Sequence, residues 1–295
     1  MKAKIIGAMV AVVLAEWIAG TARADFTLTG NQQLTVDTDS TPSSSGYLHD
    51  FSRVYLVTGG QLYTLYTYDN SAVDISGGLL NGGVYAEGSS TATISGGIVG
   101  DLHTYDNSTL EISGGDVSDL HTYGNSTANI SGGTAAWPYA YDNSTVNVSG
   151  GLVNRHFFAY NNSTVNVSGG RLTNHLRAYN NSIVNISGGQ VDDWVSAEDS
   201  STMNISGGLL NRGLFAYETS TVTFHAQDFV LGTGLSLDGD RVLGTGILSG
   251  KWFDGTPWTV TIGQNDPGAT ILAIPEPATL SLLALCGLEV FRRRR

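Results

Sequence analysis

The fold of this chain is decided by the stretch YDNSTVNVSGG at residues 141–151. Close copies recur along the sequence, and eight of them carry the same Ser-Gly-Gly triplet, preceded by a near match at Thr58-Gly59-Gly60. The triplets follow one another at intervals of 18 or 19 residues. A short repeat of almost constant length indicates a solenoid, in which each copy forms one coil and stacks on the next.

Polar and apolar residues alternate within each copy, as in a β-strand with one buried face. In the quoted copy we expect Ser144, Val146 and Val148 to point inward, and Thr145 and Asn147 to point outward. Later copies repeat the inward positions with Ser163, Val165, Val167, Ser182, Val184, Ile186, Ser201, Met203 and Ile205. A second strand follows the glycines, as in Leu102-His103-Thr104-Tyr105, where Leu and Thr should face inward.

Two kinds of corner separate these strands. The glycines suit a tight turn that needs a positive φ angle. The other corner is made by Asp-Asn or Asn-Asn pairs, whose side chains tolerate left-handed geometry and bond to nearby backbone. These pairs are Asp69-Asn70, Asp106-Asn107, Asp142-Asn143, Asn161-Asn162 and Asn180-Asn181.

We therefore expect an all-β chain that forms a single-stranded parallel β-helix, or β-solenoid, of about nine coils of 18–19 residues. Stacked Asn side chains should hydrogen-bond along its axis. Right-handed or flattened coils fit better than a left-handed helix of hexapeptides, because the inward residues are unevenly spaced around the coil. The repeats span residues 58–224, residues 25–57 form an N-terminal cap or the first coils, and residues 225–274 form a C-terminal β cap.

The first 24 residues have the pattern of a signal peptide. Lys2 and Lys4 precede an apolar run, and Ala22 and Ala24 form a small-x-small cleavage site. The run is too short for a membrane span, which needs roughly 20 apolar residues. We expect export with cleavage after Ala24.

The last residues, 275–295, contain Pro275, Glu276 and Pro277, an apolar segment, and then Arg292, Arg293, Arg294 and Arg295. This arrangement resembles the PEP-CTERM sorting signal of exported bacterial proteins. The resemblance implies recognition by an exosortase-type membrane protease and transient membrane association through the apolar segment. A plain C-terminal anchor is the alternative, although the segment is short for a bilayer. Glu289, inside the apolar segment, departs from the pattern.

Charge and cysteine content exclude several classes of function. The formal net charge is −12, and half of the 14 basic residues lie in the two terminal signals, so the processed chain would be more acidic still. Nucleic-acid binding is therefore not expected. The one cysteine, Cys286, lies in the C-terminal signal, so we expect neither a disulfide nor a thiolate metal site.

Candidate groups for catalysis or metal binding are scattered. The carboxylates are Asp69, Asp106 and Asp142 at a corner, Asp74 and Glu111 on a strand face, and the pair Asp192-Asp193. His103 and His121 occupy equivalent positions, as do His156 and His175, but no carboxylate pair completes a coordination shell. We expect no cofactor, no metal and no catalytic residue, and interpret these groups as turn and strand residues.

The outward position with the clearest pattern holds tyrosines. Stacked phenol rings would present apolar surface and hydroxyls suited to sugar chains or another protein, although aromatic stacking also stabilises a sheet by itself. The candidate binding stripe is Tyr105, Tyr123, Tyr141, Tyr160 and Tyr179.

Taken together, these features predict an exported, non-enzymatic structural or adhesive component of the bacterial cell surface or extracellular polysaccharide matrix. Its expected partners are the sorting protease and polysaccharide or other surface proteins. The alternative is a carbohydrate-active β-helix enzyme, either a lyase or a hydrolase.

Overall fold

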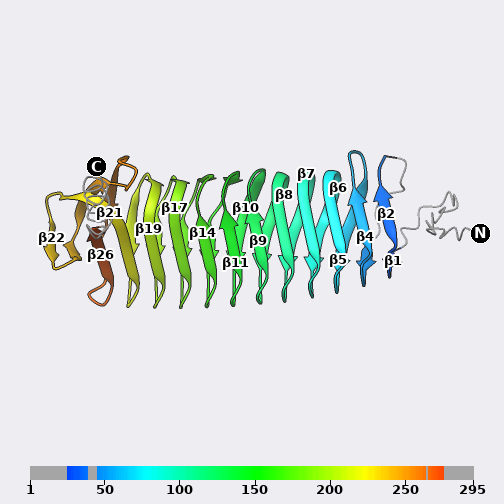
Figure 1. Cartoon of the computed structure of the whole chain (residues 1–295), viewed down its shortest axis with the longest axis horizontal. Coiled ribbons are helices and arrows are strands. Elements are labelled where there is room, and N and C mark those ends of the chain that lie inside the picture. Colours follow the sequence, from blue (N-terminus) through cyan, green and yellow to red (C-terminus); the bar gives the residue numbers. More distant parts are fainter. Residues whose placement is uncertain (1–24, 39–44, 264, 276–295) are drawn as a thin grey trace, which may run out of the picture.

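The computed structural model describes residues 25–38, 45–263 and 265–275, which form strands and turns. Figure 1 shows their coils stacked side by side into a rod, with the N-terminal coil at one end and the C-terminal strands at the other. The stack has about 10 turns of about 19 residues. The expected parallel β-helix is therefore confirmed.

The coils contain strands that pair in parallel with the same segment of the next coil. The first coils contain β1 (Phe26–Leu28), β2 (Gln33–Val36), β3 (Gly46–Leu48), β4 (Arg53–Leu56) and β5 (Gln61–Thr67). Three long strands follow, β6 (Ala72–Ala86), β7 (Thr91–Thr104) and β8 (Thr109–Thr122). Next come β9 (Thr127–Ile130), β10 (Thr134–Ala140), β11 (Thr145–Val148), β12 (Leu152–Val153), β13 (Phe157–Ala159), β14 (Thr164–Val167), β15 (Arg171–Leu172) and β16 (Leu176–Ala178). The last regular coils contain β17 (Ile183–Val191), β18 (Val195–Ala197), β19 (Thr202–Leu210), β20 (Gly213–Ala216) and β21 (Thr221–Leu231).

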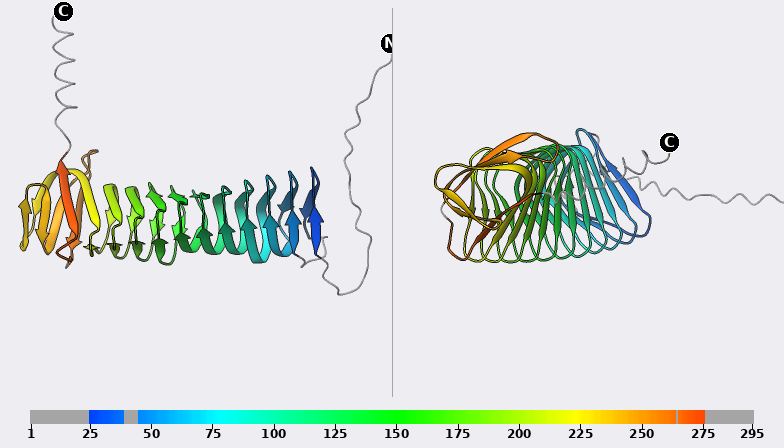
Figure 2. Two further views of the ribbon diagram at one scale, coloured as in Figure 1. Left: turned by 90° about the horizontal axis from the view of Figure 1, so that it is seen from below. Right: turned by 60° about the vertical axis from the view of Figure 1, so that its left-hand side comes forward.

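One coil contains three short segments, which define three sheets along the rod. In the coil that begins at Thr145 these are β11 in the first sheet, β12 in the second and β13 in the third. β11 pairs with β14, β12 with β15 and β13 with β16, each without a change of register. The repeat pattern predicted at least two of these strands per coil. Figure 2 shows the stack from two further directions.

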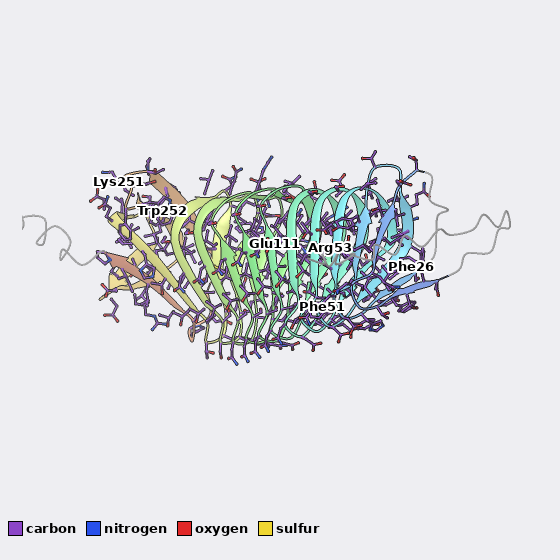
Figure 3. All side chains as sticks on the ribbon, turned by 45° about the vertical axis from the view of Figure 1, so that its right-hand side comes forward. Phe26, Phe51, Arg53, Glu111, Lys251 and Trp252 are labelled. Carbon is purple, nitrogen blue, oxygen red and sulfur yellow. The ribbon has the colours of Figure 1, made fainter. Side chains whose placement is uncertain are left out.

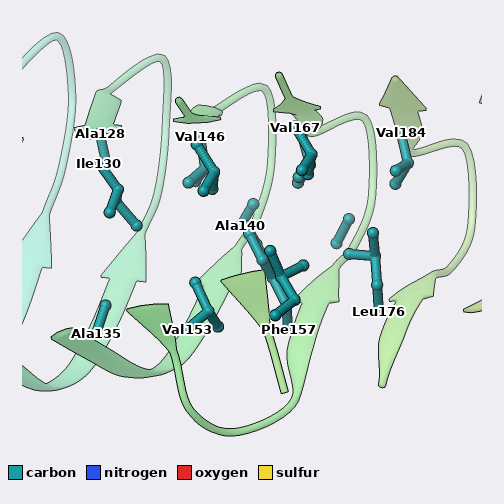
Figure 4. Close-up of a cluster of buried hydrophobic side chains, with 14 of the residues drawn as sticks. Ala128, Ile130, Ala135, Ala140, Val146, Val153, Phe157, Val167, Leu176 and Val184 are labelled. Carbon is teal, nitrogen blue, oxygen red and sulfur yellow. The ribbon is translucent and has the colours of Figure 1, made fainter. Parts of the chain in front are cut away.

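The interior is filled by the residues that the alternation assigned to it. Val146, Val148 and Phe157 are at most 1% exposed, and Figure 4 shows such side chains converging between the sheets. A column of ten serines is equally buried, and Ser71 and Ser220 donate to backbone carbonyls. Its members are Ser52, Ser71, Ser90, Ser108, Ser126, Ser144, Ser163, Ser182, Ser201 and Ser220.

Both corners have the backbone geometry that their residues suggested. The second glycine of each triplet has a positive φ, as at Gly151 (75°), and Asp142 and Asn161 at the opposite corner have φ values of 58° and 59°. The side chain at that corner also accepts a bond from the coil before it: Asp142 Oδ2 accepts the N–H of Gly124 at 3.1 Å, and Asn180 Oδ1 accepts that of Asn161 at 3.1 Å. The turn residues thus connect neighbouring coils.

The C-terminal end differs from the expected cap in one respect. β22 (Leu235–Asp238) and β23 (Arg241–Gly244) form a hairpin, and β24 (Gly246–Lys251) pairs antiparallel with both β21 and β25 (Pro257–Ile262). However, β25 pairs in parallel with β20, and β26 (Thr270–Pro275) with β21. Parallel stacking therefore resumes after residue 224. The region assigned to the cap therefore contains a further coil, made of β25 and β26, which the antiparallel insertion separates from the coils before it.

Aromatic side chains close this end of the core. Trp258 stacks on Phe224, with ring centroids 5.2 Å apart, and on Trp252, at 4.7 Å. The Trp252 indole N–H donates to the carbonyl of Gly208 at 3.0 Å. Figure 3 shows Trp252 at the end of the rod opposite Phe26.

Candidate functional site

The outer side of the third sheet carries the predicted tyrosines in an unbroken stack. We call Tyr105, Tyr123, Tyr141, Tyr160 and Tyr179 the tyrosine column. Their ring centroids lie 5.0, 4.8, 5.2 and 4.9 Å apart in that order, and the planes differ by 10° or less. Each ring is partly buried by its neighbours, so the column presents ring edges and hydroxyls rather than whole faces.

A second aromatic column runs beside the first, two residues earlier in each coil. Its neighbouring rings are 4.7 to 5.2 Å apart, and we call it the mixed column because its members differ in type. The sequence pattern did not reveal this column, because no single residue type occupies all of its positions. Its members are Tyr47, Tyr66, Tyr85, His103, His121, Tyr139 and Phe158.

The two columns contact each other and form one surface, here called the aromatic face. The hydroxyl of Tyr105 shares a hydrogen bond with Nδ1 of His103 at 3.4 Å, and Tyr123 does so with His121 at 3.3 Å. The rings of His103 and His121 stack at 4.8 Å. These histidines, which the sequence places at equivalent positions of adjacent coils, therefore lie in contact, and their Nδ1 atoms bond to tyrosines.

Partial burial in the columns changes the acidity of these groups. Desolvation, together with the neighbouring Tyr123, Tyr160 and Tyr139, raises the pKa of Tyr141 to about 12. Desolvation lowers the pKa of both His103 and His121. Neutral rings are therefore favoured on the aromatic face.

The aromatic face changes character toward the C-terminal end. The mixed column continues from Phe158 through Arg177 and Ser196 to Phe215, and Glu198 occupies the tyrosine position between Tyr179 and Tyr217. Here the surface is indented by a hollow of about 330 Å³. It is lined by His175, Arg177, Trp194, Ser196, Glu198, Phe215 and Tyr217.

The acidic candidates do not come together. Asp69, Asp106 and Asp142 accept backbone N–H groups of the preceding coil. Asp74 pairs with Arg53 at 2.8 Å, and Glu111 accepts from Asn129. Asp192 accepts from Arg171, Gln190 and Asn211. These contacts support their interpretation as structural groups.

Asp193 and the second histidine pair lie together. His156 and His175 are 4.8 Å apart, edge to face, and His175 Nε2 lies 3.1 Å from Asp193 Oδ2. In the part of the chain that the structure describes, no group of three or more His, Cys, Asp or Glu side chains could hold a metal ion.

The export and sorting residues lie largely outside the described residues. Pro275 is the last residue of β26, whereas Ala22, Ala24, Glu276, Pro277 and Arg292–Arg295 are beyond them. Within residues 25–38, 45–263 and 265–275, no helix is long and apolar enough to cross a membrane.

The architecture defines the chain as a parallel β-helix protein with an aromatic outer face. Comparison with family models, characterised proteins and solved structures gave no match.

Proposed function

We propose that this protein is an exported, non-enzymatic β-helix that acts as a structural or adhesive component of the bacterial cell surface or extracellular polysaccharide matrix. The observation that carries this proposal is the aromatic face, because stacked rings and phenolic hydroxyls suit contacts with sugar chains. The repeating coils hold these groups in line, so one extended polymer could contact several of them at once.

The terminal sequences support export and sorting. In this proposal the first 24 residues direct the chain out of the cytoplasm, and an exosortase-type protease recognises Pro275 to Pro277 and the terminal arginines. The apolar segment between these motifs would hold the chain at the membrane only until processing.

Cell fractionation tests this localisation. We expect the wild-type chain in the envelope or extracellular matrix at a mass lower than that of the full sequence, because both signals are removed. A variant without Arg292–Arg295 should accumulate unprocessed in the membrane fraction. Wild-type protein that stays in the cytoplasm at full mass would contradict the proposal.

The alternative, a carbohydrate-active enzyme, has one observation in its favour. Asp101 and Asp119 occupy paired positions on adjacent coils, and burial and the charge of Asp101 raise the pKa of the Asp119 carboxyl. Glycoside hydrolysis requires two neighbouring carboxyl groups, one of which has a raised pKa and acts as the general acid. New reducing or unsaturated ends released from polysaccharide by wild type, but not by Asp119→Asn, would favour the enzyme.

A further inference from the structure

The hollow in the aromatic face is built around a missing ring. Ser196 stands in the mixed column between Arg177 and Phe215, where other coils carry Tyr85, Tyr139 or Phe158. Serine is smaller than a ring, and Ser196 is itself only 6% exposed, so it forms the floor of the hollow and larger side chains form its sides. Trp194 and Glu198, two residues before and after Ser196, line the hollow, which is open to solvent.

One wall of the hollow is apolar. The rings of Trp194 and Phe215 are 4.9 Å apart and inclined at 58°, so they form an angled corner. Tyr217 stacks beside Phe215 at 5.9 Å, and Arg212 lies 5.7 Å from the centre of the Trp194 ring. Such a corner suits the C–H face of a sugar ring.

The opposite walls are polar and held in place. Arg177 contacts Tyr179 Oη at 3.3 Å and His175 Nδ1 at 2.9 Å, while His175 Nε2 faces Asp193. These contacts use only part of the five N–H donors of a guanidinium. Glu198 Oε1 accepts the hydroxyl of Ser196 at 3.0 Å, and its other oxygen is left for a ligand.

We propose that this hollow binds one neutral sugar residue of a polysaccharide. The sugar ring packs against Trp194 and Phe215, and its hydroxyls bond to Arg177 and Glu198. Because each hydroxyl both donates and accepts, a donor and an acceptor side by side suit a vicinal pair. The Glu198 carboxylate and the acidic chain disfavour a uronic acid at the same place.

The volume agrees with a small ligand, since it lies near the lower end of the roughly 300–1,000 Å³ range of ligand pockets. The inference rests on the proposal that the aromatic face binds polysaccharide. It adds where on that face one sugar residue is bound and that this residue is neutral.

Calorimetric titration of the purified protein tests the inference. The probes are cellohexaose, maltohexaose, xylohexaose and mannohexaose, with hexagalacturonate as the acidic comparison. We expect at least one neutral hexasaccharide to bind with one site per chain. Glu198→Gln and Arg177→Gln should each weaken binding roughly tenfold, the effect of losing one hydrogen bond to a charged group.

Two further variants separate the site from its surroundings. Ser196→Phe should abolish binding and keep the fold, because phenylalanine occupies the same column at Phe158 and Phe215. Glu87→Gln is the matched control. Glu87 lies two residues after Tyr85, just as Glu198 lies two residues after Ser196, but the Tyr85 ring occupies its position in the mixed column. The affinity for the sugar should therefore not change in this variant. Thermal unfolding confirms that each variant is folded.

Three results would overturn the inference: binding unaffected by Ser196→Phe, binding to hexagalacturonate alone, or no binding to any probe. None of them bears on export, which cell fractionation decides separately. If substitution of Tyr141 and Tyr160 abolished sugar binding while the Ser196→Phe variant still bound normally, the tyrosine column would be the binding site instead.

Discussion

At the residue scale, the two glycines of each triplet are required for different reasons. A Cβ on Gly150 would lie 2.3 Å from the carbonyl oxygen of Ser131 in the coil before it, so the first glycine permits close stacking. Gly151 has a φ of 75°, which side chains disfavour, so the second glycine permits the turn. The sequence predicted the turn, whereas the close approach became visible only when the coils were placed on one another.

The histidines of the mixed column make stability depend on pH. Burial lowers the pKa of His103 and His121 in the folded protein, while Asp101 and Asp119 oppose this shift only partly. The unfolded chain therefore takes up protons first as pH falls below about 6.5. We expect the melting temperature to decrease as the pH is lowered from about 7.5 to about 5.5.

A double variant, His103→Tyr with His121→Tyr, isolates this contribution. Tyrosine occupies the same column at Tyr85 and Tyr139, so the ring stack is retained while the titrating groups are lost. The difference in melting temperature between the two pH values should be smaller in the variant. An equal or larger difference would show that other groups cause the dependence.

At the scale of single elements, the first sheet carries a ladder of side-chain amides. The first member donates through Nδ2 to Glu111 Oε1 at 2.6 Å, and each later member donates through Nδ2 to the Oδ1 of the asparagine one coil earlier, at 2.7 to 2.9 Å. The predicted axial bonding of asparagines is confirmed. Its members are Asn129, Asn147, Asn166, Asn185 and Asn204.

The position of an asparagine in this ladder should determine its contribution to stability. Asn166 has two ladder bonds, whereas Asn204, at the end, has one. With about 1 kcal/mol per bond, Asn166→Thr should lower the free energy of unfolding by about 1 kcal/mol more than Asn204→Thr. Threonine suits both sites because Thr223 pairs with Asn204 in the next coil. Denaturant unfolding measures both, and equal losses would contradict a bonded ladder.

The elements also show where sequence reasoning succeeds and where it ends. Strict alternation predicted the buried faces of β11 and β14 because one residue type recurs at each position. The mixed column could not be predicted in this way because tyrosine, histidine and phenylalanine all carry planar aromatic rings but are different residue types. The hollow at Ser196 could not be found either, since it depends on which side chain is absent beside Trp194.

On the scale of the whole molecule, the stacked coils convert a sequence repeat into a repeated surface. The last coil escaped prediction because the insertion after β21 separates it from its neighbours, and because Asp266-Pro267-Gly268 replaces the usual corner. Asp266 nevertheless accepts the backbone N–H of Glu218 at 2.9 Å. The other corner carboxylates likewise accept a backbone N–H from the coil before them. Antiparallel strands and stacked tryptophans then cover the end, which limits pairing with another chain.

The central claim is that the aromatic face is the surface that meets polysaccharide. Its most direct test is the retention of purified protein on the extracellular polysaccharide of the cells that produce it. The variant Tyr141→Ser with Tyr160→Ser is compared with the control Thr127→Ser with Thr145→Ser, which alters the first sheet of the same two coils. At about 1 kcal/mol per ring, we predict that the tyrosine variant binds roughly tenfold or more weakly and that the control is unchanged. Equal retention of wild type and the tyrosine variant would contradict the claim.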